Sequence, residues 1–466
     1  MSANDPTGYE PSWYTATMSA GERRARLTFD LDVDACVIGG GLAGLTTARE
    51  LARRGWSVAV LEAERIAWQA SGRNSGFVLP GFAEAPERII ERVGIPHARA
   101  LWTLSQSGVD YVRDTIVETG MTGVDPVPGW LEVTKSQNPE DFLAHVDVLA
   151  GKLGLDTEVW SIDRVRRVLR TEAYFSGLHF PHAFHIHPLN YALGLAAAAE
   201  QAGARIFEDT PALSIDPAGV RKRIVTPAGR LRAAHIVLAG NASLGPLAPA
   251  LAGTVFPVTT YTVTTAPLGD RLGAAIGYGG AVSDSQWADS HYRVIDGDRL
   301  LWTGRMTTWA ADPRRYSRDL TGQIRRIYPQ LGKVEVEHAW AGTMGFAVHR
   351  MPQIGEVAPG LWVASAFGGQ GINTTAMAGM LIARAIAERD QTWRLFAPYE
   401  LVWAGGALMR AAVQVSYWGS RAHEGIRARL TNRRRSRRRR SAAKAEAAAA
   451  KPVNNPPRPA GGRDSA

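Results

Sequence analysis

Hydrophobic and polar residues follow two different periods along this 466-residue chain. Near the N-terminus, an acidic lead runs into a short apolar segment at 32–38, and after a group of glycines a helix-like spacing covers 45–55. A second apolar run, 56–62, ends on Glu62. This pattern predicts a strand, a tight turn, a helix and a second strand in succession.

Two later segments alternate with period two. Residues 254–268, TVFPVTTYTVTTAPL, and residues 291–306, HYRVIDGDRLLWTGRM, place apolar or β-branched side chains at every second position. This alternation is typical of a sheet that is buried on one face only. Further strands are expected within 204–215, 229–241 and 360–369.

The first glycine turn carries the spacing of a nucleotide-binding site. Gly39, Gly41 and Gly44 fit G-x-G-x-x-G between the first predicted strand and the helix. Gly39 permits the tight turn, Gly41 lets backbone N–H groups approach a diphosphate, and Gly44 allows close helix packing. Glu62, at the end of the second strand, is suited to accept hydrogen bonds from ribose hydroxyls.

The segment after the second strand favours a flavin over a nicotinamide dinucleotide. Residues 63–76 read AERIAWQASGRNSG, with small residues and the donors Arg73 and Asn74. Such a segment suits a loop around the phosphates and ribityl chain of an extended cofactor. Nicotinamide enzymes need no equivalent. The residues assigned to this loop are Ser71, Gly72, Arg73 and Asn74.

Several further motifs carry a resemblance to a known family. They are ASGRNSG at 70–76, HIHPLN at 185–190, VLAGNASLG at 237–245, HYR at 291–293, RMPQIG at 350–355 and AFGGQGINTTAM at 366–377. In this order they resemble the D-amino-acid-oxidase-like FAD-dependent flavoproteins, and within them the γ-glutamylputrescine oxidase group. The resemblance covers residues 10 to 430.

The resemblance implies an α/β fold with an α+β second domain, of the glutathione-reductase-2-like kind. A Rossmann-type FAD domain would lie beside a substrate domain whose antiparallel sheet roofs the flavin. The expected division is an N-terminal arm over 1–32 and a discontinuous two-domain body over 33–430. The FAD domain takes approximately 33–110, 185–250 and 350–430, and the substrate domain approximately 111–184 and 251–349.

The late glycine turn is expected at the isoalloxazine end of the same cofactor. In proteins similar to this chain, Gly368, Gly369, Gln370 and Gly371 bring backbone N–H groups and a helix N-terminus to the pyrimidine edge of the ring. Negative charge develops there on reduction, and a helix N-terminus stabilises it. Relatives commonly carry histidine where this chain has Gln370. Gly240, within VLAGNASLG, is also assigned to the cofactor site.

The FAD is expected to be bound without a covalent link. Relatives of the sarcosine-oxidase type tether FAD through a cysteine in the C-terminal half, whereas the only cysteine here is Cys36, inside the first strand. No histidine falls within 68–76. A metal site is not expected either, because no carboxylate partner for His185 and His187 is evident from the spacing.

The resemblance also implies oxidation of an amine C–N bond, as in polyamine catabolism, by hydride transfer to the flavin. In amino-acid oxidases of this fold an arginine binds the substrate carboxylate, and Met344 stands near the matching position; Arg350 is a weaker candidate. Tyr292, Trp340 and Gln370 are predicted to line the pocket. With oxygen as acceptor, the products are an imine or aldehyde and hydrogen peroxide.

Three alternatives stay open: an amino-acid or sarcosine-type oxidase, a flavin dehydrogenase that passes electrons to another acceptor, and a flavoprotein that has become a binding module. No lysine occurs between Lys222 and Lys333, where sarcosine oxidases supply a lysine above the flavin to favour oxygen. Oxygen and a different electron acceptor therefore both stay open.

Charge changes the picture only at the C-terminus. Residues 433–466 contain eleven Arg and Lys against two acids, which accounts for the whole net charge of +9. The rest of the chain is neutral, which argues against specific nucleic-acid binding. We expect a disordered tail capable of weak contact with polyanions or an anionic membrane surface. No apolar signal segment begins the chain, so a cytoplasmic location is expected.

Overall fold

The computed structural model describes residues 8–19, 21–284 and 290–419. The chain forms two compact units, Met1–Ala411 and Ala412–Ala466. Both sheets and the candidate site belong to the first unit. The expected tail at 433–466 lies outside the described residues. Among the described helices, none combines enough length and apolar character to cross a membrane.

The first sheet is the nucleotide-binding type of sheet that the sequence predicts. Its strands run in the order β16-β17-β10-β1-β2-β7, and β1 pairs in parallel with both β10 and β2. The short strands β8 and β9 extend it through antiparallel pairs. The bounds are β1 Leu31–Ile38, β2 Val58–Leu61, β7 Arg205–Phe207, β8 Ser214–Asp216, β9 Lys222–Val225, β10 Arg230–Leu238, β16 Gln353–Ala358 and β17 Leu361–Ser365.

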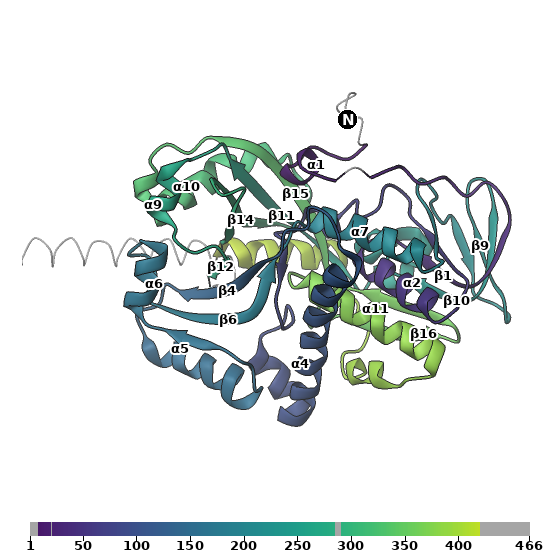
Figure 1. The fold of residues 1–466 in the computed structure, drawn as a ribbon. Helices are drawn as coiled ribbons and strands as arrows, with labels where there is room; N and C mark the ends of the chain where they lie inside the picture. Colours follow the sequence, from purple (N-terminus) through teal and green to yellow (C-terminus); the bar gives the residue numbers. More distant parts are fainter. Residues whose placement is uncertain (1–7, 20, 285–289, 420–466) are drawn as a thin grey trace, which may run out of the picture. The chain divides into compact units, whose positions relative to one another are not determined.

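Burial on both faces explains the almost continuous apolar run of β1. One face packs Ala35 and Val37 against helices, and the other packs Cys36 and Ile38 into a separate cluster with β10. The helices on the first face are α2 (Leu42–Arg53), α7 (Pro188–Gln201) and α11 (Gly371–Glu388), seen beside β1 and β10 in Figure 1. The predicted strand, turn, helix and strand at 32–62 are confirmed.

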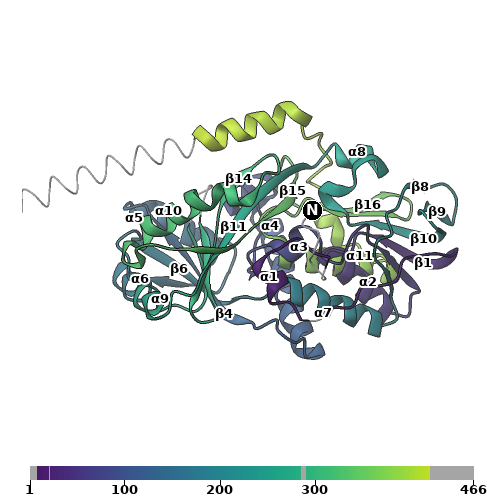
Figure 2. The same cartoon turned by 90° about the horizontal axis from the view of Figure 1, so that it is seen from above.

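The second sheet has the order β15-β11-β14-β13-β12-β4-β6-β3, with β5 paired to β6. Most of its pairs are antiparallel, and β12 with β4 is parallel. Figures 1 and 2 both show it beside the first sheet. The bounds are β3 Phe77–Val78, β4 Val127–Thr134, β5 Glu158–Trp160, β6 Ser176–His185, β11 Phe256–Thr265, β12 Ala281–Asp284, β13 His291–Ile295, β14 Arg299–Thr307 and β15 Val336–Phe346.

The second sheet is buried on both faces, which corrects the expectation of one solvated face. Its outer face carries Tyr261 and Trp302 into a cluster under the helix α10 (Ser317–Ile327). Its inner face, which points to the glycine loops of the first sheet, carries Thr262 and Thr303, whose hydroxyls lie 2.8 Å apart. The period-two pattern therefore separates an apolar buried face from a hydroxyl-rich buried face.

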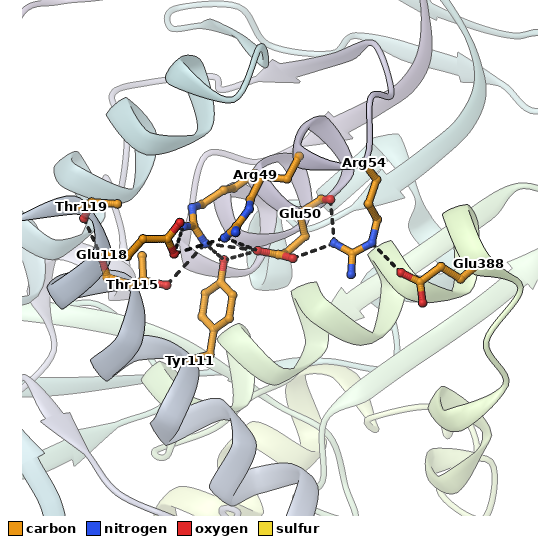
Figure 3. A network of polar contacts seen from close by, with 9 residues as sticks. Arg49, Glu50, Arg54, Tyr111, Thr115, Glu118, Thr119 and Glu388 are labelled. Atoms are coloured by element: carbon orange, nitrogen blue, oxygen red, sulfur yellow. Dashed lines mark hydrogen bonds and ion pairs between the residues drawn. The ribbon is translucent and has the colours of Figure 1, made fainter.

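The long helix α4 (Pro86–Thr119) is bent near its start, where Gly94 has a φ of 77°. A polar network, drawn in Figure 3, joins α4 to α2 and α11. The Arg49 guanidinium, almost fully buried on α2, donates to the Tyr111 hydroxyl at 2.9 Å and to the Glu118 carboxylate at 2.9 Å. Arg54 bridges Glu50 and Glu388.

This network borders a surface pocket of about 420 Å³. The pocket lies toward the C-terminal end of α2, whereas the glycine turn precedes its N-terminus. The charged side chains Arg49, Glu50, Arg54 and Glu118 form ion pairs with one another or with Glu388. These charges are already compensated, so we assign the pocket a structural role.

The N-terminal segment is more than the arm expected over 1–32. Its short helix α1 (Trp13–Ala16) carries Tyr14, which is fully buried and packs edge-on against Trp340 at a ring separation of 5.2 Å. Leu27 is buried in the first sheet's cluster. The remaining helices are α3 Ala70–Arg73, α5 Pro139–Val146, α6 Ile162–Leu169, α8 Pro249–Ala252 and α9 Asp270–Ala275.

The two helices that follow the glycine turns touch at Gly379. A Cβ at this position of α11 would lie 2.5 Å from the Thr46 Cβ of α2. Gly379→Val should therefore lower the free energy of unfolding by about 1–3 kcal/mol through overpacking, measured by urea denaturation. Gly322→Ala is the matched control, because a Cβ there meets no atom within 4 Å on helix α10. Equal stability of the two variants would contradict this close contact.

Candidate functional site

The candidate site lies where four neighbouring parallel strands end. Strands β2, β1, β10 and β17 are adjacent and parallel, so their carboxyl ends share one edge. Ligands of open α/β sheets bind at this edge. The segments that follow are Glu62, residues 39–44, residues 239–245 and residues 366–371. At about 4.8 Å per strand, they span about 14 Å, which suits an extended dinucleotide.

The first turn is shaped so that only glycine fits at its critical positions. Gly39 has a φ of 114°, and a Cβ there would lie 2.8 Å from the Ala239 carbonyl. A Cβ on Gly44 would lie 2.0 Å from the Gly39 oxygen. Gly41, at the start of α2, has no side chain to block the helix N-terminus. The structure therefore accounts for glycine at Gly39 and Gly44, and the approach of Gly41 to a diphosphate stays a prediction.

Glu62 lies beside this turn, as its spacing predicts. Its carboxylate accepts hydrogen bonds from the Gly40 N–H at 2.6 Å and from the Glu64 N–H at 3.0 Å. Burial raises the pKa of Glu62, and the two backbone donors oppose that rise. The donors orient the carboxylate at the strand end, where a ribose hydroxyl would be its further partner.

The segment 70–76 folds over the start of α2. The Ser71 hydroxyl oxygen accepts a hydrogen bond from the Leu42 N–H at 3.1 Å, and it would lie 3.0 Å from a Cβ on Gly41. A Cβ on Gly72 would lie 2.5 Å from the Ala67 oxygen. Ser71 and Gly72 therefore close the first glycine turn from one side, in agreement with a cofactor loop.

Arg73 and Asn74 differ in what they offer a ligand. Arg73 donates to the Glu10 carboxylate at 2.6 Å, and its buried Nη2 has no hydrogen-bond partner within the described part of the chain. Asn74 donates to the backbone oxygens of Ala70 and Ser71 and accepts from the Gly76 N–H. The structure thus gives the Asn74 side chain a turn-shaping role in place of the predicted donor role.

Gly240 follows β10 at the shared edge of the strands, and the side chain of its neighbour Asn241 contacts another loop of the site. Asn241 has a φ of 50°, and its side-chain oxygen accepts from the Ala366 N–H at 3.0 Å. A Cβ on Gly345 of β15 would lie 2.2 Å from that same oxygen. Asn241 therefore connects two cofactor loops to the second sheet. Its place directly after an apolar strand was a usable signal that the sequence analysis missed.

The glycines of the late turn differ in their surroundings. Gly368 has a positive φ and close neighbours, whereas Gly369 and Gly371 face open space. Gly368 has a φ of 62°, its N–H donates to the Gly345 oxygen at 3.0 Å, and a Cβ would lie 2.5 Å from the Ala83 Cβ. Cβ atoms on Gly369 and Gly371 would meet no atom within 4 Å. The fold itself therefore requires glycine only at Gly368. Glycine at the other two positions leaves room beside the α11 N-terminus.

Gln370 immediately precedes α11, and its side-chain amide is not fully hydrogen-bonded within the described residues. Its side-chain oxygen is buried and lacks a hydrogen-bond partner among the described residues. A Cβ on Gly81 would lie 3.5 Å from that oxygen. A buried acceptor without a hydrogen-bond donor is energetically unfavourable. We therefore expect a ligand to donate a hydrogen bond to this oxygen. Gln370 is thus placed beside the open space of the late turn.

Trp340 and Tyr292 have different environments. Trp340 lies on the inner face of the second sheet and donates from its indole N–H to the Arg73 oxygen at 3.0 Å. Tyr292 is fully buried in the outer-face cluster, where its hydroxyl lies 2.7 Å from that of Tyr328. Trp340 positions the cofactor loop, whereas the surroundings of Tyr292 are those of a core residue and give no support to a catalytic role.

The inner face presents His291 where the sequence analysis chose Tyr292. His291 is opposite Thr303 in the strand register, and its ring meets Phe77 edge-on. Its Nδ1 lies 2.9 Å from the Ser283 hydroxyl oxygen, to which the Trp130 indole also donates. Burial lowers the pKa of His291 to about 4, so the imidazole is neutral at physiological pH.

These features fit FAD. The glycine cradle accepts a diphosphate at a helix N-terminus, Glu62 suits a ribose, and the open space at Gly369 and Gly371 adjoins an unpaired acceptor at Gln370. Cys36 is buried in the middle of β1. A non-covalent cofactor stays our prediction. The fold and the site together define a dinucleotide-binding oxidoreductase.

Comparisons with known proteins agree with this class. The family model described as FAD dependent oxidoreductase (DAO) matches residues 34–385, so the chain belongs to this FAD-dependent family. It is 30% identical over 432 residues to the γ-glutamylputrescine oxidoreductase of Escherichia coli, covering 90% of this chain and 100% of that protein. It is also 30% identical to the probable oxidoreductase OrdL of Rhizobium meliloti, over 89% and 97% of the two chains.

Solved structures show the same fold at lower identity. Glycine oxidase from Geobacillus kaustophilus superposes with a TM-score of 0.67 at 22% identity, over 80% of this chain and 99% of that one. L-Proline dehydrogenase from P. horikoshii gives 0.67 at 19% identity, over 80% and 100%. The predicted family, mixed α/β fold and FAD dependence are therefore confirmed.

The open space at Gly371 yields a test that separates cofactor binding from folding. Gly371→Val adds a branched side chain that no protein atom obstructs, so the apoprotein should keep its melting temperature. The dissociation constant of FAD should rise about 5- to 140-fold, since overpacking a filled site costs about 1–3 kcal/mol. Fluorescence titration of apoprotein with FAD measures this constant.

Gly273→Val is the matched control, because a Cβ on Gly273 also meets no atom within 4 Å and this residue lies on α9. It should bind FAD as the wild type does. Gln370→His should also retain FAD, because the family resemblance implies a histidine at this position. Wild-type affinity in Gly371→Val would show that the cofactor lies away from this turn.

Proposed function

We propose that this protein oxidises the C–N bond of an amine whose carboxylate is absent or distant from the reacting carbon. The observation that carries the proposal is the neutral inner face of β11 and β15. Three successive pairs on this face carry no charged side chain: Val258 with Met344, Thr260 with Gly342, and Thr262 with Trp340. The next pair is Thr264 with His338, and burial lowers the pKa of that histidine, which favours its neutral form. An α-carboxylate placed against these strands would lose water without gaining an ionic partner.

Arginine is the residue that would change this conclusion, since its planar guanidinium binds carboxylates through two hydrogen bonds. Arg305 lies on β14 opposite Tyr261, an outer-face residue, and pairs with Asp319. Arg293 lies on the inner face, but its guanidinium contacts His185 and Tyr14 and is almost fully buried. Neither is presented to a small substrate in the way an amino-acid oxidase requires. Arg73, whose buried Nη2 lacks a partner among the described residues, belongs to the segment that we assign to FAD, and we propose that this donor binds the cofactor.

His291 is our candidate for contact with the substrate nitrogen. Hydride loss from carbon requires the amine in its neutral form, because the nitrogen lone pair stabilises the positive charge that develops on carbon. A neutral imidazole accepts a hydrogen bond from an amine N–H. The contact with Ser283, itself a partner of Trp130, orients the ring. Because desolvation lowers the pKa of His291 to about 4, its neutral state persists over the physiological pH range.

FAD, when bound, supplies the hydride acceptor, and the protein groups bind, orient and desolvate the amine. The amine is oxidised to an imine by losing a hydride to the acceptor and a proton to solvent, and water then hydrolyses the imine to an aldehyde and ammonia or a smaller amine. The named activity of the Escherichia coli relative, on γ-glutamylputrescine, makes a long amine of this kind the first substrate to test. We extend the proposal to polyamine catabolism on the same ground.

A flavin-reduction assay tests the proposed substrate class. Under anaerobic conditions, γ-glutamylputrescine or a related diamine derivative should bleach the flavin absorbance, whereas glycine, sarcosine and proline should do so at least about tenfold more slowly, since their carboxylates meet no ionic partner. Readmitted oxygen and an electron-accepting dye, compared in parallel, identify the electron acceptor. Faster reduction by an α-amino acid than by any amine would contradict the proposal.

The basic tail carries a separate proposal, namely weak contact with polyanions or an anionic membrane surface. Its eleven basic residues supply the entire net charge. Deletion of residues 433–466 should leave FAD content and amine oxidation within about twofold and abolish salt-sensitive retention on heparin. Loss of FAD from the truncated protein would show instead that the tail belongs to the fold. A cytoplasmic location stays a prediction.

A further inference from the structure

Arg293 is a buried cation surrounded by neutral groups. Only 4% of this residue is exposed. One terminal nitrogen lies 2.6 Å from His185 Nδ1, and the other donates to the Tyr14 hydroxyl at 3.1 Å. Across the described residues, no carboxylate approaches the Arg293 nitrogens within the 4.0 Å of an ion pair. Its Nε also lacks a partner within that part of the chain.

Comparably buried arginines in this protein are compensated. Arg49 pairs with Glu50 and Glu118, and Arg65 pairs with Glu208. A buried charge without a counterion is strongly unfavourable, so the environment of Arg293 calls for an anion that the described protein does not supply.

The two histidines near Arg293 are uncharged and do not compensate its positive charge. Burial, together with the Arg293 charge, lowers the pKa of His185 and of His187 to about 3. His185 Nε2 lies 3.0 Å from the Gly279 oxygen, and His187 Nδ1 accepts from the Asn190 N–H as α7 begins. Both rings are therefore neutral, and the positive charge at this point belongs to Arg293 alone among these three side chains.

The position of Arg293 connects its charge to the cofactor site. A Cβ on Gly76 would lie 2.8 Å from Arg293 Nη2, so the guanidinium lies against the end of the segment 70–76. The Ser75 hydroxyl in that segment donates to Thr303 at 3.0 Å. Thr303 is paired with His291, two residues before Arg293 on the same face of β13.

We propose that Arg293 is the buried countercharge of the flavin and stabilises the negative charge that the ring system acquires on reduction. The guanidinium acts through space, because it is almost fully buried against His185, Tyr14 and Gly76. In a site closed to water, such a charge has a much larger effect than at the surface. The inference rests on the FAD site and does not depend on which substrate the enzyme oxidises.

Two other anions are less suitable partners. The diphosphate of FAD is accounted for by the first glycine turn and the α2 N-terminus, on the first-sheet side of the site. A substrate carboxylate would need direct access to the guanidinium, and Arg293 is almost fully buried. The charge acquired by the flavin ring needs neither direct contact nor displacement of Tyr14 or His185.

Sulfite binding tests the proposal without a substrate. Sulfite adds through its sulfur lone pair to N5 of oxidised flavin, and the ring system of the product carries negative charge. Arg293→Gln should raise the sulfite dissociation constant of the holoenzyme at least about tenfold, and Arg293→Lys should leave it within about threefold because the charge remains. Tyr14→Phe, the matched control, removes one Arg293 hydrogen bond but no charge and should change the constant less than about twofold.

Unchanged sulfite affinity in Arg293→Gln would overturn the proposal, and so would a wild-type holoenzyme with no measurable sulfite complex. If Arg293→Gln is obtained without FAD, the decision falls to the lysine variant. Retained flavin and near-wild-type sulfite affinity in Arg293→Lys support the charge. Loss of flavin in both variants would show that Arg293 serves only the geometry of its hydrogen bonds. None of these outcomes requires an amine substrate, so they are independent of the proposed function.

Discussion

Parallel pairing of β2, β1, β10 and β17 is the constraint on which the rest of the structure depends. Because the four strands end at one edge, segments separated by more than 300 residues become neighbours. Glu62 and the first glycine turn lie at one side of this edge, and the late glycine turn lies at the other. This arrangement supports our prediction that the two turns bind one extended ligand.

The second sheet completes the site through close contacts with these loops. Trp340 donates to the Arg73 backbone, Ser75 donates to Thr303, and the Gly368 N–H donates to Gly345. The inner face of the sheet is therefore fixed above the cofactor loops. Thr–Thr and Ser–Thr hydrogen bonds offset part of the desolvation cost of this hydroxyl-rich face. The face is also uncharged where we propose that an amine would lie.

Much of the fold was predictable from sequence because its signals are local. The G-x-G-x-x-G turn, the flanking strands and the period-two segments each depend on neighbouring residues, and the ordered motifs identified the family. The prediction that Tyr292 lines the pocket chose the wrong face of its strand. Alternation places residues 291 and 293 on one face and 292 on the other, but it does not say which face lies toward the cofactor.

Other features depend on contacts that a sequence pattern does not contain. Asn74 looks like a free donor until its amide is seen to bond Ala70 and Ser71. Gly371 leaves open space in which we expect a ligand, whereas glycine at Gly368 is required by the backbone conformation and the nearby Ala83. The burial of Tyr14 likewise depends on the distant residues Trp340 and Arg293.

Hydrogen–deuterium exchange of the apoprotein and the FAD-loaded protein tests the central claim most directly. If one cofactor spans the four strand ends, FAD should slow exchange in residues 39–44, around Gly240, and in residues 366–374 at the start of α11. Gly322, on the far helix α10, should exchange alike in both forms. Protection confined to residues 39–44, with the late turn unchanged, would contradict the account.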